Sequence, residues 1–217
     1  MHLVIFDIDG TLTQTYHSKD HSFTRALSRF VDIEPGYSYW GEIEHPTDEA
    51  VFQYLFQKVS GKKATEEDRA KMQDQLIVEL MHTYRHTPNF FDEIPGASRF
   101  IKELKEEENT LLAISTGNWE RVGRMKVELA GLNPNDFEWV GSDEFPDKPG
   151  FTTSLINRIK EKQELSRITY IGDSLYDYET SRVLGINFIG IDFLQKGHMN
   201  HLTFCPIYAD FREIQFL

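Results

Sequence analysis

Polar side chains follow three short apolar runs of the sequence, at the point where each run ends. Asp7 and Asp9 come directly after the first run, the segment 115–118 follows the second, and Asp173 with Asp177 follows the third. Carboxylates that meet without a basic partner are suited to a hard cation. Mg²⁺ takes a few carboxylate oxygens and keeps waters and substrate phosphate oxygens as its other ligands. The pattern therefore predicts a magnesium site beside a bound phosphate group.

A bound phosphate also needs hydrogen-bond donors from the chain. The backbone N–H groups of the segment 10–11 and of Thr116, Gly117 and Asn118 could surround its oxygens. The net charge of −12 would repel an anion, so a positive side chain is required as well. Lys148 is the candidate, in the loop expected after residue 140.

The elements that must position these groups can be recognised by their hydrophobic patterns. Four short runs of apolar and β-branched residues predict buried parallel strands, at 3–6, 110–114, 168–171 and 186–189. Weaker strands are expected at 137–140 and 207–208. Helical patterns lie between them, at 97–108, 119–130, 155–159 and 175–184. This alternation predicts an α/β fold, a doubly wound parallel sheet with a Rossmann-like core, in which ligands bind at the carboxyl ends of the strands.

The segment 16–92 interrupts this alternation. It has no clear strand and three helical patterns, at 22–30, 48–59 and 65–84. Thr47 and Thr65 are suitable N-cap residues for the second and third of these helices. We therefore predict a catalytic core made of residues 1–15 and 93–217, with an α-helical cap domain inserted at 16–92.

Four motifs of the sequence together resemble those of the haloacid dehalogenase-like hydrolase superfamily. Residues 7–13 are similar to its first motif, and Thr116 after an apolar run is similar to its second. Lys148 before Pro149 resembles the third motif, and residues 172–177 resemble the fourth. The resemblance covers the whole chain, because the insert stands where the family has its cap domain. The subgroup it resembles most is that of phosphoglycolate phosphatase and β-phosphoglucomutase.

The resemblance implies a role for each of the principal residues. Asp7 is expected to be the nucleophile, since a carboxylate can attack phosphorus and form an aspartyl-phosphate. Asp9 is expected to be the general acid and base, and its backbone carbonyl resembles a metal ligand of the family. Lys148 should offset charge on Asp7 and on the phosphate. Asp173 is expected to bind Mg²⁺ directly, and Asp177 either through water or by orienting Lys148.

Two neighbouring residues compete for the second motif. Thr116 or Ser115 should donate its hydroxyl to a phosphate oxygen, and successive strand residues point to opposite faces. Only one of the two should therefore point into the site, and we favour Thr116.

Together these features predict a Mg²⁺-dependent phosphatase that hydrolyses a small phosphorylated metabolite. Asp9 disfavours dehalogenation, because the family's dehalogenases lack the second aspartate. Two alternatives stay open, a sugar-phosphate mutase similar to β-phosphoglucomutase and a non-catalytic binding protein on the same scaffold.

The overall composition limits the partners and the compartment. The chain has 23 Lys and Arg against 35 Asp and Glu, which disfavours nucleic acid and anionic membrane surfaces as partners. It has one cysteine, and its first residues lack the pattern of a signal peptide. We expect a cytoplasmic protein that is a monomer or a weak homodimer.

The insert also contains polar and aromatic residues that could choose the substrate. The candidates are His17, His21, Tyr37, Tyr39, Trp40, Glu42, His45 and Arg85. His17 follows the first motif closely, and Arg85 could pair with a second anionic group of a substrate.

Overall fold

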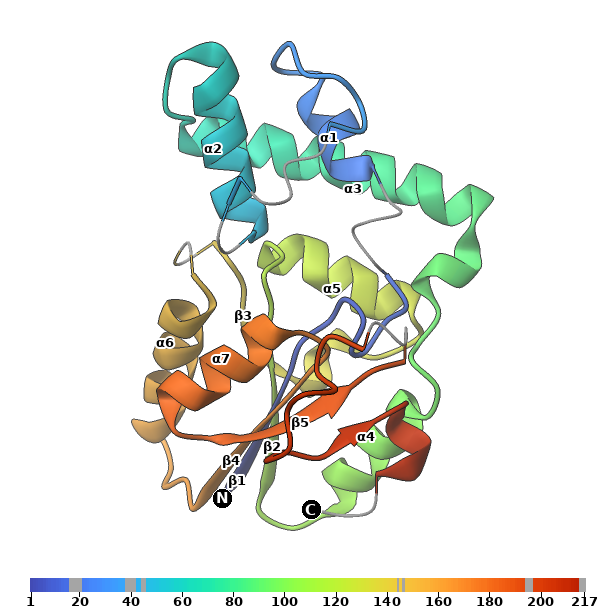
Figure 1. Cartoon of the computed structure of the whole chain (residues 1–217), viewed down its shortest axis with the longest axis vertical. Helices are drawn as coiled ribbons and strands as arrows, with labels where there is room; N and C mark the ends of the chain where they lie inside the picture. The colour runs from blue at the N-terminus through green and yellow to red at the C-terminus, as the bar shows by residue number, and fades with distance from the viewer. Residues whose placement is uncertain are drawn as a thin grey trace.

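A six-stranded sheet forms the centre of the protein (Figure 1). The computed structural model describes residues 1–15, 21–37, 42–43, 46–143, 145, 147–193 and 197–214. The strands are β1 (His2–Phe6), β2 (Thr110–Ser115), β3 (Glu138–Val140), β4 (Arg167–Gly172), β5 (Asn187–Ile191) and β6 (Ile207–Tyr208). Their order is β3-β2-β1-β4-β5-β6, and all neighbours are parallel.

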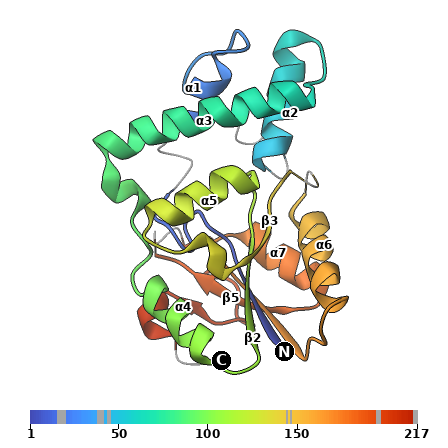
Figure 2. The same ribbon diagram turned by 180° about the vertical axis from the view of Figure 1, so that it is seen from behind.

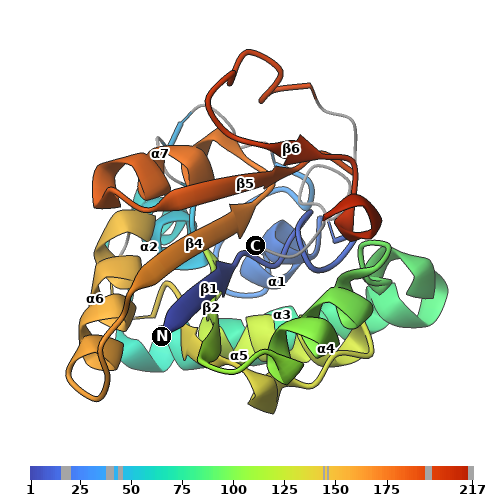
Figure 3. The same ribbon diagram turned by 90° about the horizontal axis from the view of Figure 1, so that it is seen from below.

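Helices cover both faces of this sheet (Figure 3). One face carries α4 (Ala97–Glu106) and α5 (Glu120–Leu129), and the other carries α6 (Lys148–Lys160) and α7 (Leu175–Leu184). Along β1, Val4 and Phe6 pack on the α4 side, while Leu3 and Ile5 pack on the α6 side. Both faces are therefore apolar, which explains why the strands are short unbroken hydrophobic runs. The predicted doubly wound α/β fold is confirmed.

The position of β1 determines where the site forms. It lies between β2 and β4, with Phe6 level with Ile114 and Ile171. The residues that follow these three strands therefore emerge side by side at one edge of the sheet.

A helical segment lies beyond this edge, between β1 and α4 in the sequence (Figure 1). It contains α1 (Ser22–Leu27), α2 (Asp48–Ser60), α3 (Glu66–His86) and the 3₁₀ turn η1 (Pro88–Phe91). The Thr47 hydroxyl caps α2, and Thr65 with Asp68 forms a capping box on α3. Helix α1 is shorter than the predicted 22–30, because the chain turns after Leu27 and the Phe30 N–H bonds to its carbonyl. None of the helices in the described ranges is long and apolar enough to cross a bilayer.

The helical segment shares a hydrophobic cluster with α5, above which α3 runs (Figure 2). Trp119, directly before α5, is fully buried there. Its ring stacks on Phe23 of α1 at 5.9 Å and meets Phe52 of α2 edge-on at 5.7 Å. Its indole N–H donates to Glu49 at 2.8 Å. Trp119 therefore joins the helical segment to the chain that follows the second motif.

We expect Trp119→Ala to lower the free energy of unfolding by about 3–5 kcal/mol, because it empties a large site between α1, α2 and α5. Urea denaturation followed by circular dichroism measures this. Trp119→Phe is the matched control. It keeps an aromatic ring and most of the packing, but it loses the hydrogen bond to Glu49. A loss below about 1 kcal/mol for the alanine variant would contradict this account of the interface.

Candidate active site

Asp7 stands at the centre of the site, immediately after β1. Its backbone N–H donates to Ile171 at 3.0 Å, so the sheet holds its main chain. Its side chain is buried, and Lys148 Nζ lies 3.2 Å from its Oδ1. The pKa of Asp7 is raised to about 7: burial is the largest cause, Lys148 opposes it, and the neighbouring carboxylates of Asp177 and Asp173 add to the rise.

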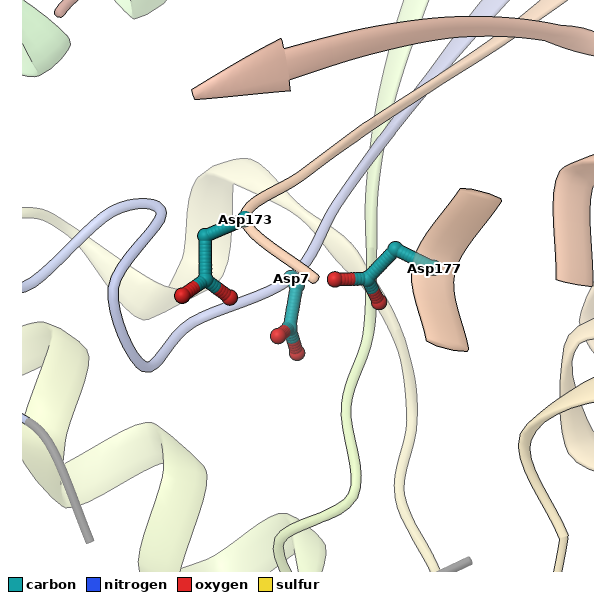
Figure 4. A group of neighbouring side chains, drawn as sticks. All are labelled: Asp7, Asp173 and Asp177. Carbon is teal, nitrogen blue, oxygen red and sulfur yellow. The ribbon is translucent and has the colours of Figure 1, made fainter. Parts of the chain in front are cut away.

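Two further carboxylates flank Asp7 (Figure 4). Oxygens of Asp7, Asp173 and Asp177 all lie within 4.8 Å of one another. Gly10 makes room for this arrangement, because a Cβ atom there would lie 2.3 Å from Asp173 Oδ2, and its φ of +79° suits glycine. The cluster consists of hard oxygen donors, which fit a divalent cation of the Mg²⁺ type.

Asp177 lies deeper than the other two carboxylates. Its Oδ1 accepts a 2.5 Å bond from Lys148, and its Oδ2 accepts bonds from the backbone N–H and hydroxyl of Ser174. The Asp177 N–H donates back to the Ser174 hydroxyl oxygen, which completes a capping box on α7. It is fully buried, and it does not line the cavity of the site. Of the two roles predicted for it, this geometry favours the orientation of Lys148.

Lys148 reaches the site from the start of a helix. It is the first residue of α6, and the prediction of a loop at this position is wrong. Asp147 caps the helix and Pro149 occupies its first turn, so the main chain is already helical at Lys148. Burial acts to lower the pKa of Lys148, but Asp177 and Asp7 hold it well above its ordinary value, so the side chain stays charged.

The second motif places one of its two hydroxyl groups in the cavity. Thr116 lines it, together with Gly117 and Asn118. Ser115 points to the other face of the sheet, where its hydroxyl pairs with Thr152 at 2.6 Å. The structure thus brings Thr116 to the site and leaves Ser115 beneath it, as the alternation along a strand requires.

Several N–H groups predicted to surround a phosphate are already engaged. Gly10 N–H donates to Thr13 O and Thr11 N–H to Ile8 O, within the turn after β1. Thr116 N–H donates to Val140 O. These three groups hold the loops in shape, which corrects the prediction that they face the ligand.

Asp9 also lines the cavity, and its carboxylate is held from several sides. Lys126 Nζ lies 2.8 and 3.0 Å from its two oxygens, and Asn118 Nδ2 donates to Oδ2 at 2.6 Å. The Thr15 hydroxyl also donates to Oδ1. Sequence reasoning missed Lys126. The available signal is its position four residues after Val122, on the face of α5 that is otherwise apolar.

Residues from all four motifs border a cavity of about 370 Å³: Asp7, Asp9, Thr116, Gly117, Asn118, Lys148 and Asp173. Its other walls come from the helical segment and from the loops after β4 and β5, with Pro46, Thr47, Asp48, Ser174, Leu175, Tyr176 and His198. Four of the proposed specificity residues, His21, Tyr37, Glu42 and Arg85, do not line it. The other four, His17, Tyr39, Trp40 and His45, lie outside the described residues.

Comparison with known proteins agrees with this fold. The family model for haloacid dehalogenase-like hydrolases matches residues 4–191. A phosphoglycolate phosphatase of Mesorhizobium japonicum is 25% identical over 196 residues, covering 88% of this chain and 82% of the relative. The chain belongs to the haloacid dehalogenase-like hydrolase family. The expected enzyme class, a phosphoric monoester hydrolase, is thereby confirmed.

Solved structures share the fold at lower identity. A hydrolase from Pseudomonas syringae has a TM-score of 0.68 and 18% identity, covering 97% of this chain and 94% of its own. CbbY from Rhodobacter sphaeroides, solved in complex with phosphate, has a TM-score of 0.69 and 16% identity, covering 97% of this chain and 95% of its own. The architecture described above is therefore shared with these two solved structures.

Proposed function

We propose that this protein is a Mg²⁺-dependent phosphatase that hydrolyses a small phosphorylated metabolite through an aspartyl-phosphate on Asp7. One observation carries the proposal. The carboxylate of Asp7 lies at the end of the central strand, against the charged Lys148 and opposite Asp173, and it lines a cavity. A buried carboxylate beside a fixed cation is a suitable nucleophile for a phosphate ester.

The reaction proceeds in two steps. Asp7 attacks phosphorus, a carboxylate–phosphorus bond forms, and the bond to the alcohol oxygen breaks as Asp9 gives that oxygen a proton. Water then attacks the phosphorus of the aspartyl-phosphate, Asp9 takes its proton, and the Asp7 carboxylate is released with inorganic phosphate. Lys148 and the Thr116 hydroxyl offset charge on the transferring group in both steps.

The residues around the cavity carry a net negative charge, which favours the binding of a divalent cation. Among the described residues five carboxylates and two ammonium groups lie in or beside the cavity: Asp7, Asp9, Asp48, Asp173, Asp177, Lys126 and Lys148. When all are ionised they leave three formal negative charges, so a divalent cation would offset most of the charge that opposes a phosphate. Asp7 and Asp173 would hold the ion, which when bound would draw the phosphate in and stabilise its developing charge.

The size of the cavity supports a small substrate. A volume of about 370 Å³ lies at the lower end of the range for small-molecule sites. Thr47 and Asp48 border it from the helical segment, and Asp48 N–H donates to Gly117 O at 2.8 Å. We assign residues 16–92 as a cap over a core of 1–15 and 93–217. The name of the Mesorhizobium relative makes phosphoglycolate the first ester to test.

The test is a phosphate-release screen over phosphorylated metabolites, with and without Mg²⁺. We expect one or a few small esters to be hydrolysed, and folded phosphoproteins to be left intact because they do not fit the cavity. Release of phosphate from none of a broad panel would refute the proposal. A sugar phosphate that isomerises without releasing phosphate would indicate a mutase instead.

The wall made by the helical segment should affect the metabolite more than a generic ester. We expect Asp48→Asn to lower kcat/KM about 10-fold for a best metabolite that carries a hydroxyl, since it removes a charged acceptor, and to raise it for phosphoglycolate, whose carboxylate the charge of Asp48 opposes. The value for p-nitrophenyl phosphate should change less than about 2-fold, because that ester needs only the phosphate end. Asp74→Asn, an exposed charge removal on α3, is the control. Equal losses on both substrates would contradict the assignment.

A further inference from the structure

Lys126 is a buried lysine on a helix of the core. Only 3% of its surface is exposed, because it lies on α5 among residues that pack against the sheet and the helical segment. A buried ammonium group is stable only when its charge is paired and its donors are used. The partners of the Lys126 ammonium group therefore indicate why a lysine is buried at this position.

All three donors of the Lys126 ammonium group have acceptors. These acceptors are the two carboxylate oxygens of Asp9, at 2.8 and 3.0 Å, and Asn118 Oδ1, at 2.8 Å. Asn118 in turn donates through Nδ2 to Asp9 at 2.6 Å and to the Thr116 hydroxyl at 2.9 Å. The amide thus links the lysine, the carboxylate and the second motif in one closed network.

Each of the two carboxylates proposed to be catalytic, Asp7 and Asp9, contacts a different buried lysine. Lys148 contacts Asp7 and Asp177, and Lys126 contacts Asp9. Lys126 does not line the cavity, so it reaches the reacting atoms only through Asp9 and Asn118. The two bonds from Lys126 Nζ hold the Asp9 carboxylate in position, and the bond from Asn118 Nδ2 to Oδ2 limits the rotation of its plane.

We propose that Lys126 is a positioning residue, which holds the Asp9 carboxylate in the orientation needed to protonate the leaving alcohol and then to activate water. The proposal rests on the proposed phosphatase function. It adds a residue whose contribution comes through another side chain, 117 positions away in the sequence. The competing explanation is that Lys126 and Asp9 form an ion pair that only stabilises the fold. A positioning residue should slow one step of the reaction selectively, whereas a purely structural residue should lower only the amount of correctly folded enzyme.

The test uses p-nitrophenyl phosphate and rapid mixing. Its phenolate leaves without a proton, so formation of the aspartyl-phosphate should be little affected in Lys126→Met. Hydrolysis of that intermediate still needs Asp9 as a base. We expect a full burst of nitrophenol, one equivalent per enzyme, followed by turnover lowered about 10²-fold, the scale of general base catalysis.

Arg124→Met is the matched control on the same helix. Arg124 binds Glu120 at 2.7 Å, lies over the Trp139 ring and does not line the cavity, so its variant should keep wild-type turnover. In an Asp9→Asn background, Lys126→Met should cost no further turnover, because both changes act on one function. Lys126→Gln, which keeps a hydrogen-bond donor, serves as the second variant should the methionine variant fail to fold.

Two results would overturn the proposal. One is turnover in Lys126→Met equal to that of Arg124→Met. The other is a burst that shrinks in proportion to turnover, with losses that add to those of Asp9→Asn, since that pattern describes a smaller fraction of correctly folded enzyme. If Asp7→Asn keeps full turnover, the aspartyl-phosphate mechanism itself fails. If Asp7→Asn is inactive while Lys126→Met is normal, only the role of Lys126 fails.

Discussion

Replacing Asp7 with asparagine should lower turnover of the best substrate at least about 10³-fold, because it removes the covalent route while keeping the size of the side chain. The amide is a poor nucleophile for phosphorus, and it no longer forms an ion pair with Lys148. Steady-state kinetics on the purified variant measures this loss. A circular dichroism spectrum like that of the wild type shows that the fold is kept.

The same prediction can be checked on the intermediate itself. Acid quenching of the wild type during turnover, followed by peptide mass spectrometry, should locate phosphate on Asp7. Asp74→Asn, in which an exposed carboxylate on α3 is removed, should leave both turnover and labelling unchanged. Phosphate on a histidine, or no phosphoenzyme while turnover continues, would contradict the assignment of the nucleophile.

The core of the fold could be predicted because its strands are buried on both faces. Such strands have short apolar sequences, distinct from the helical patterns between them. Even the two-residue strand β6 agreed with expectation. The bounds of α1 did not, since the turn after Leu27 depends on local hydrogen bonds that the hydrophobic pattern does not contain.

Part of the site could also be predicted, for a geometric reason. The ends of neighbouring parallel strands meet at one edge, so Asp7, Thr116 and Asp173 had to be close whatever the details of packing. Lys126 differs from these, because its contact with Asp9 depends on how α5 is rotated against the sheet. The apolar face of α5 indicates that Lys126 points inward, but the sequence pattern does not identify Asp9 as its partner.

The role of Trp119 also could not be predicted, because it depends on contacts with residues that are distant in the sequence. It follows the second motif in the sequence, but its ring packs among Phe23 and Phe52 of the helical segment. Deleting that segment would therefore expose a fully buried tryptophan, and the truncated protein would lose stability as well as substrate contacts. Asp48→Asn keeps the Trp119 ring and, through its amide oxygen, an acceptor for the Trp119 backbone N–H that Asp48 binds at 3.1 Å, so it separates these two effects better than deletion does.

Removal of divalent cations should abolish turnover. Asp7, Asp9 and Asp173 all border the cavity in which the phosphate must lie. Without a cation their charges oppose both binding of the phosphate and attack on it. Incubation with EDTA followed by gel filtration should reduce phosphate release to background, and added Mg²⁺ should restore it. An equal ionic strength of NaCl should not restore it, which separates a bound ion from general screening of charge.

Binding of the metal can be measured without turnover. Mg²⁺ that binds the folded protein raises its melting temperature, and the rise grows with concentration as RT ln(1 + [Mg²⁺]/Kd). Asp173→Asn should reduce this shift, because it replaces a charged ligand by a neutral one beside Asp7. Asp136→Asn, a charge removal at a surface pair with Lys105, should keep the shift of the wild type. Full turnover after exhaustive chelation, together with a melting temperature that does not respond to Mg²⁺, would contradict the metal site. Among the described residues, Lys148 would then be the lysine left to offset the charge of the phosphate at the cavity.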